Sequence, residues 1–210
     1  MRKFISITQA SVLALALLIM FSSVGLARGV RSQELQEDCL VVEGEVYELS
    51  EQQEEDLVFM YEEEKLAHDL YAEFAELWDA RIFANIADSE TRHMAAIARL
   101  LDKYDLELET LERGEFNDQE LAELYDELLE QGQQSYEAAL EVGREVEIID
   151  IEDLETKAAR ATPDVETVFN NLKAGSYNHL AAFERQLEGG ATQSSSSRNS
   201  DRGNGRGRRN

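Results

Sequence analysis

The chain has 210 residues, and its 44 acidic and 20 basic side chains give a formal net charge of −24 at pH 7. This length fits one domain with tails, and a single proline with few β-branched runs favours an all-α fold. The negative charge lies in the segment 28–190, which should repel nucleic acid and anionic lipid and attract cations. A solvated helix surface or a high-salt habitat explains the same charge, so charge alone identifies no substrate.

The first residues have the pattern of a secretory signal peptide. The basic start MRK precedes an apolar run over 12–21, and small residues end at Ala27. We expect cleavage after residue 27, which predicts an extracytoplasmic location: periplasm, cell envelope or secreted. An uncleaved membrane anchor is the rival interpretation, but the apolar run is short for a bilayer. Residues 28–49 lack a sustained period and are interpreted as a leader.

The next two segments carry apolar residues with a helical period. The first helix is predicted over 50–78, where Ser50 and Gln53 have the spacing of a capping box. A short break near Asp79 then predicts an antiparallel neighbour over 81–104.

A long acidic connection follows, and it contains an amphipathic piece over 119–130 that we interpret as a crossover helix. The third long helix is predicted over 135–160, and the fourth over 162–188, with Pro163 at its first helical position. This order predicts an antiparallel four-helix bundle over 50–188, with the crossover helix between helices 2 and 3.

Residues 189–210 form a Ser/Gly/Arg-rich tract that is too polar to pack, so we expect a disordered tail. Arginine–glycine segments bind RNA in some proteins, but export argues against a nucleic-acid partner here. Contact of the tail with anionic surfaces, or with the acidic bodies of sister molecules, is the simpler interpretation. The oligomeric state stays open.

Each of the four apolar stripes is interrupted near its middle by polar residues. Unpaired buried carboxylates are costly, so acids and imidazoles at mid-length of four helices indicate a positive ion between them. The spacing of Glu90 and His93 places both on one helix face. His68, beside Asp69, is the weakest candidate and is interpreted as structural. The interrupting residues are Glu64, Glu90, His93, Glu147, Asp150, Ser176 and His179.

Five stretches resemble the ferritin-like superfamily and, within it, a rubrerythrin-related group known as domain of unknown function 2202. They are EEEKLAHDLY, NIADSETRHM, FNDQELAELYDELLEQG, EVEIIDIEDL and NLKAGSYNHLAAF, which together span roughly residues 50–187. The resemblance implies a ferritin-like bundle that holds two metal ions with one Glu on each of two helices and a Glu-x-x-His on each of the others. The implied metal ligands are Glu64, Glu90, His93, Glu147 and His179.

The chain departs from that pattern on the fourth helix, where Ser176 occupies the place of the expected Glu. Asp150, one turn after Glu147, could supply the missing oxygen from another direction. The resemblance therefore implies either two iron ions or one ion with a labile second. Tyr71 also resembles the tyrosine that follows the first Glu in rubrerythrins.

The favoured function is that of a di-iron carboxylate protein that reacts with O₂ or peroxide as an oxidoreductase or ferroxidase-like protein. Manganese also suits ligands of this kind. Cys39 is the only cysteine, so no iron–sulfur donor is built in and an external electron donor is needed. No catalytic residue is assigned. Two alternatives stay open, metal binding without turnover and a structural helical bundle of the cell envelope, and metal content separates the three.

Overall fold

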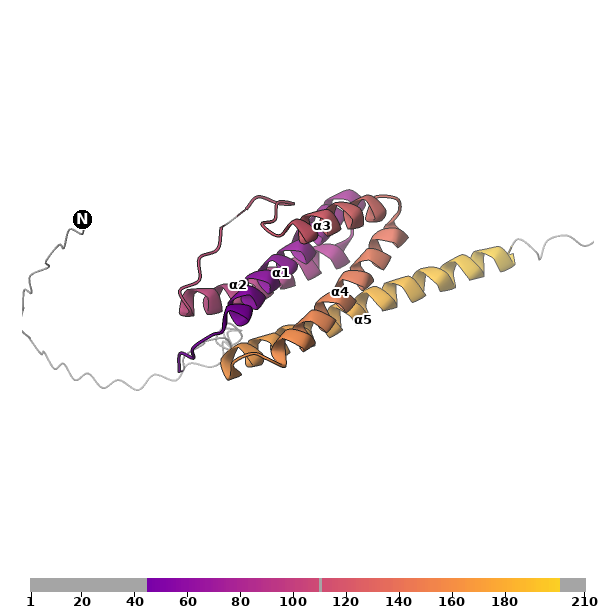
Figure 1. The fold of residues 1–210 in the computed structure, drawn as a ribbon. Coiled ribbons are helices and arrows are strands. Elements are labelled where there is room, and N and C mark those ends of the chain that lie inside the picture. The colour runs from indigo at the N-terminus through magenta and orange to yellow at the C-terminus, as the bar shows by residue number, and fades with distance from the viewer. Residues whose placement is uncertain (1–44, 110, 201–210) are drawn as a thin grey trace, which may run out of the picture. The chain divides into compact units, whose positions relative to one another are not determined.

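The computed structural model describes residues 45–109 and 111–200, and this part of the chain is all-helical, without strands. The all-α prediction is therefore confirmed. The five helices, labelled in Figure 1, are α1 (Glu51–Trp78), α2 (Arg81–Lys103), α3 (Gln119–Gly132), α4 (Tyr136–Ala158) and α5 (Pro163–Ser200).

The structure tests the predicted boundaries only in part at the two ends of the chain. The predicted signal peptide 1–27, most of the leader 28–49 and residues 201–210 lie outside the described residues. Within the described ranges, no helix has the length and apolarity that a membrane crossing requires. Helix α5 continues to Ser200, past the predicted boundary at 188, because no proline follows Pro163 and a helical glycine costs only about 1 kcal/mol.

The helices pack as two neighbouring pairs. The left-handed conformation of Asp79 (φ 48°) ends α1 and turns the chain directly into α2. Contacts are most extensive between α1 and α2 and between α4 and α5, and the pairs meet where α1 contacts α4 and α2 contacts α5 (Figure 1). Helix α3 packs on α1 and α4.

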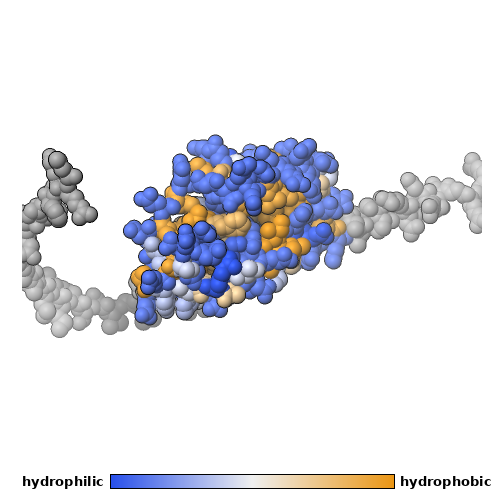
Figure 2. All heavy atoms as spheres, in the orientation of Figure 1, coloured by the Kyte–Doolittle hydropathy of each residue, from blue (hydrophilic) through white to orange (hydrophobic). Residues whose placement is uncertain are grey.

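Two apolar clusters form the core, at different levels along the long helices. One, here the Phe83 cluster, includes Phe74, Phe83 and Phe183. The other, the Leu100 cluster, includes Met60, Leu100 and Phe169. On each long helix the polar positions noted in the sequence fall between these clusters, and we call this level the polar layer. The face in Figure 2 is mostly hydrophilic, with hydrophobic residues showing in patches between hydrophilic ones.

Buried carboxylates of α1 hold the connection that leads to α3. Glu62 accepts hydrogen bonds from the backbone N–H groups of Asn117 (2.9 Å) and Asp118 (2.9 Å), and from the Asn117 amide (2.7 Å). Asp69 accepts from the Gly114 N–H (3.0 Å) and pairs with Lys65. The connection is thereby tied to α1 just before α3 begins.

We predict that Glu62→Ala lowers the free energy of unfolding by about 1–3 kcal/mol, because it removes the buried carboxylate that accepts three hydrogen bonds from the connection. The matched control is Glu73→Ala, which also breaks a contact from α1 to the connection, with Arg113 (3.2 Å), but at an exposed position. That variant should cost less than about 0.5 kcal/mol. Urea unfolding of both variants measures the difference, and equal effects would contradict the anchoring role of Glu62.

Candidate metal centre

Four helices direct carboxylates or imidazoles into the polar layer. Glu64 lies in one row with Met60, Ala67 and Tyr71, all at helical spacing, so the packing of α1 turns it inward. The carboxylates of this centre are each 2 % exposed. The contributions are Glu64 from α1, Glu90 and His93 from α2, Glu147 from α4 and His179 from α5.

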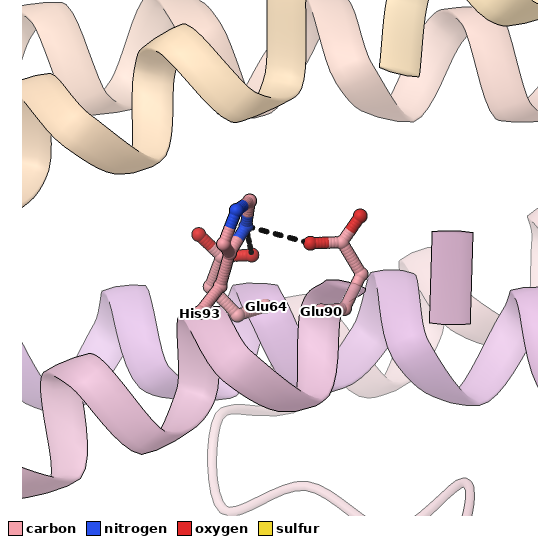
Figure 3. Close-up of side chains that lie close together, drawn as sticks. All are labelled: Glu64, Glu90 and His93. Atoms are coloured by element: carbon pink, nitrogen blue, oxygen red, sulfur yellow. Dashed lines mark hydrogen bonds and ion pairs between the residues drawn. The ribbon is translucent and has the colours of Figure 1, made fainter. Parts of the chain in front are cut away.

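Glu64, Glu90 and His93 form the first group, in which one ligand atom from each residue lies within 4.8 Å of the others. The Nδ1 atom of His93 is 3.1 Å from Oε2 of Glu64 and 2.7 Å from Oε2 of Glu90. Figure 3 shows the two carboxylates turned toward this ring nitrogen. The arrangement offers one nitrogen and two carboxylates to a single point.

Glu90, Glu147 and His179 form the second group, within the same 4.8 Å limit. Nδ1 of His179 is 2.8 Å from Oε1 of Glu90 and 3.5 Å from Oε2 of Glu147. Glu90 therefore belongs to both groups and turns a different oxygen toward each imidazole. The rings of His93 and His179 are stacked, with centroids 5.4 Å apart and planes 27° apart.

Tyr71 orients the α4 carboxylate. Its hydroxyl donates to Oε1 of Glu147 (2.7 Å) and approaches the carbonyl oxygen of Gly143 (3.3 Å). Burial, together with the charge of Glu147, raises the pKa of Tyr71, so the hydroxyl keeps its proton and remains a donor. The other oxygen of Glu147 is left to face His179.

Asp150 lies beside the two groups and belongs to neither. It is buried, and its Oδ1 atom has no hydrogen-bond partner among the described residues. Burial and the charges of Glu64, Glu63 and Glu147 raise its pKa, while a hydrogen bond with Ser176 opposes that rise. The Ser176 hydroxyl also donates to the carbonyl oxygen of Leu172 (3.1 Å). The structure thus brings five of the six predicted ligands together and leaves Asp150 adjacent to them.

Sequence reasoning overlooked Glu63, which is as buried as its neighbours. Its Oε2 atom has no partner in the described chain, and burial, with Asp153 nearby, raises its pKa well above the usual value. The pair of Asp153 and Lys157 (2.9 Å) lies on the facing side of α4. Glu147, Asp150 and Asp153 follow one another at intervals of three residues and form an acidic row on α4. This row was the sequence feature that could have indicated a further buried acid facing it.

Burial and the nearby charges shift the pKa values of the ionisable groups in the centre. Burial raises the pKa values of Glu64 and Glu147 to about 7. Burial also opposes ionisation of Glu90, but two imidazoles outweigh it and lower its pKa to about 2. Against burial, the surrounding carboxylates raise the pKa of His93 to about 11 and that of His179 to about 9.

Four buried atoms at this level make no hydrogen bond within the described residues: Oε2 of Glu63, Oε1 of Glu64, Oδ1 of Asp150 and Nδ1 of His179. For His179 this holds although Glu90 is 2.8 Å away, so the contact lacks hydrogen-bonding geometry. A bound metal ion accepts lone pairs from several carboxylate oxygens and imidazole nitrogens at once, whereas one proton joins only two of these atoms. The residues present therefore fit a metal ion with mixed oxygen and nitrogen ligands.

Comparison with known proteins identifies relatives that extend across this centre. The profile of the uncharacterized protein domain DUF2202 matches residues 53–202, which include every candidate ligand. The uncharacterized protein MJ0754 of Methanocaldococcus jannaschii is 42% identical over 142 residues, covering 66% of this chain and 77% of that protein. The crystal structure of hypothetical protein MJ0754 from Methanococcus jannaschii DSM 2661 has a TM-score of 0.68 and 39% identity, covering 70% of this chain and 86% of that chain.

We predict that the metal-free protein becomes less stable as the pH rises from 5 to 9. Glu64 and Glu147 have folded pKa values of about 7, above the ordinary 4.5, so their ionisation costs stability as pH rises through this interval. The imidazoles have raised values too, so their stabilising charge is lost above the ordinary 6.5. Both effects have the same sign.

Each of the two carboxylate shifts corresponds to about 3 kcal/mol, so the loss in unfolding free energy should be at least that large, measured by urea unfolding at fixed ionic strength. Glu147→Gln removes one of these groups and should flatten the dependence between pH 5 and 7. Stability that is constant or rises over this range would show that the acids are not held as described.

Proposed function

The chain belongs to the family of the uncharacterized protein domain DUF2202, and from this membership and its buried carboxylate–imidazole groups we propose that it is an exported ferritin-like metal-binding protein. In this proposal α1, α2, α4 and α5 are an antiparallel four-helix bundle of the rubrerythrin-related kind, and α3 is the crossover helix. The contacts of α1 with α4 and of α2 with α5 support it, as does the packing of α3 on α1 and α4.

We propose iron as the resident metal, and manganese as the alternative because it prefers the same kinds of ligand. Glu64, Glu90 and His93 would hold one ion, and Glu90, Glu147 and His179 would hold the second. The observation that carries the proposal is the position of Glu90, whose two oxygens face two different imidazoles at 2.7 and 2.8 Å. Bound iron would supply electron transfer to O₂ or peroxide.

The protein side chains would supply position, protons and shielding from water. Tyr71 holds its proton against Oε1 of Glu147 and so fixes the direction of that carboxylate. The Phe83 and Leu100 clusters border the polar layer on both sides and limit the access of water along the helices. Reducing equivalents come from an external donor, since Cys39 is the only cysteine.

A single-ion protein without turnover is the second candidate, and Ser176 is the observation that favours it. The expected α5 carboxylate is absent, and the Ser176 hydroxyl is engaged with the Leu172 carbonyl. The second group then has fewer oxygens than a ferritin-like site provides. Asp150 decides between the candidates, because it is the nearby buried carboxylate that could complete the second position.

We predict that anaerobic reconstitution with Fe²⁺ loads up to two ions per chain. Glu90→Ala should release both ions, because both groups use Glu90, whereas His93→Ala should release mainly the ion of the first group. Helicity should persist in both variants, because the apolar clusters supply most of the folding energy. Elemental analysis with circular dichroism measures these outcomes, and Glu152→Ala, at an exposed position on α4, is the matched control.

Asp150→Asn separates the two candidates. Loss of one ion supports a two-ion site completed by Asp150, and no change supports one tight ion with a labile second. Stopped-flow oxidation of the ferrous protein with O₂ and with peroxide then tests turnover. Retained iron without reaction would favour binding alone, and failure to retain any metal would leave the structural bundle as the function.

Export is part of the proposal and rests on the basic start and apolar run of residues 1–27. We expect the native protein to begin at Arg28 and to be recovered from the extracytoplasmic fraction. N-terminal sequencing of the purified native chain measures this. A mature chain that still begins at Met1 in the cytoplasm would remove the assignment, and recovery with the membrane would favour the uncleaved anchor.

A further inference from the structure

Gly175 lies against the edge of the His93 imidazole. A Cβ atom added at Gly175 would lie 2.6 Å from Nε2 and 2.9 Å from Cε1 of His93, closer than a Cβ atom approaches other atoms in proteins. The ring of a residue on α2 therefore occupies the space where a side chain of α5 would begin.

Helical spacing relates this contact to the second group. Gly175 and His179 are four residues apart, so they lie one turn apart on the same face of α5. The His93 ring contacts Gly175 and stacks on His179. Helix α5 thus contacts His93 at two places: the backbone at Gly175 lies at the edge of the ring, and the His179 imidazole stacks on the ring.

A glycine inside a helix needs a reason, because it destabilises the helix relative to alanine. The backbone at Gly175 is ordinary helix and carries no positive φ, so conformational freedom is not the reason. The contact with His93 is the remaining constraint on this position.

We propose that Gly175 is a positioning residue, whose missing side chain lets His93 present Nδ1 to Glu64 and Glu90. The expected effect on metal binding rests on the proposed function, but the contact between Gly175 and His93 does not depend on any metal. A side chain at position 175 pushes the imidazole away from α5 and moves Nδ1 off the point that the two carboxylates share. The first group then loses its nitrogen ligand.

The test compares Gly175→Ala with Gly189→Ala on the same helix, where an added Cβ meets no atom within 4 Å. The probe is Mn²⁺, with free ion followed by electron paramagnetic resonance. Gly175→Ala should weaken binding of one ion about 10- to 100-fold, the range seen when a residue that orients a ligand is changed. Gly189→Ala should bind as the wild type does.

A second measurement uses the metal-free chain, so it tests the position of His93 even if the protein binds no metal. With ¹⁵N-labelled histidine, Gly175→Ala should move the NMR signals of the His93 ring nitrogens, and Gly189→Ala should not. If the wild type binds no metal but the His93 signals move, the positioning role stands while metal binding fails. Unmoved His93 signals, or wild-type Mn²⁺ affinity in Gly175→Ala, would overturn the inference.

The His93→Ala background separates positioning from a general effect on folding. Without the ring, the methyl of Gly175→Ala has space, so the added substitution should cause no further loss of Mn²⁺ binding. It should also raise the melting temperature relative to His93→Ala alone, because alanine favours the helix. If Gly175→Ala fails to fold, folding of this double variant still supports the inference. Equal harm in both backgrounds would refute it.

Discussion

The cost of burying carboxylates constrains the whole described structure. Glu90 is almost completely removed from water, and its two oxygens lie 2.7 and 2.8 Å from the Nδ1 atoms of imidazoles on α2 and α5. An unpaired carboxylate at this depth would cost several kcal/mol, so the helices must deliver their partners at the same level. One helical turn is about 5.4 Å, and a slip of that size would separate the charges from their partners. The polar layer therefore specifies how the long helices align.

Apolar packing and the polar layer have different roles in this arrangement. The Phe83 and Leu100 clusters bury large side chains on either side and supply most of the free energy of folding. The polar layer adds little net stability, because desolvation offsets much of the attraction between its charges. What it adds is direction: Tyr71 orients Glu147, and Gly175 gives space to His93. These contacts thus contribute little to the free energy of folding, and their main effect is to orient the side chains of the centre.

Three consecutive acids of α1 illustrate how fully that helix is enclosed. Glu62 reaches the connection before α3, Glu63 faces the acidic row of α4, and Glu64 meets His93 of α2. Successive residues of a helix point about 100° apart, so three neighbouring side chains meet three different surroundings. A helix buried on several sides loses the contrast between an apolar and a polar face. Charged residues at such positions appear exposed when only the local sequence is considered.

The sequence by itself determined the all-α class, the approximate bounds of α1 to α4, the start of α5 and the level at which polar residues interrupt the apolar stripes of the long helices. These features depend on helical period, capping and proline, which act within a few residues. Only the tertiary structure decided that Glu90 is shared, that Nδ1 of each imidazole faces the carboxylates, that Asp150 stays beside the groups and that Gly175 receives His93. These depend on the rotation and level of helices distant in sequence, which side-chain packing between them sets.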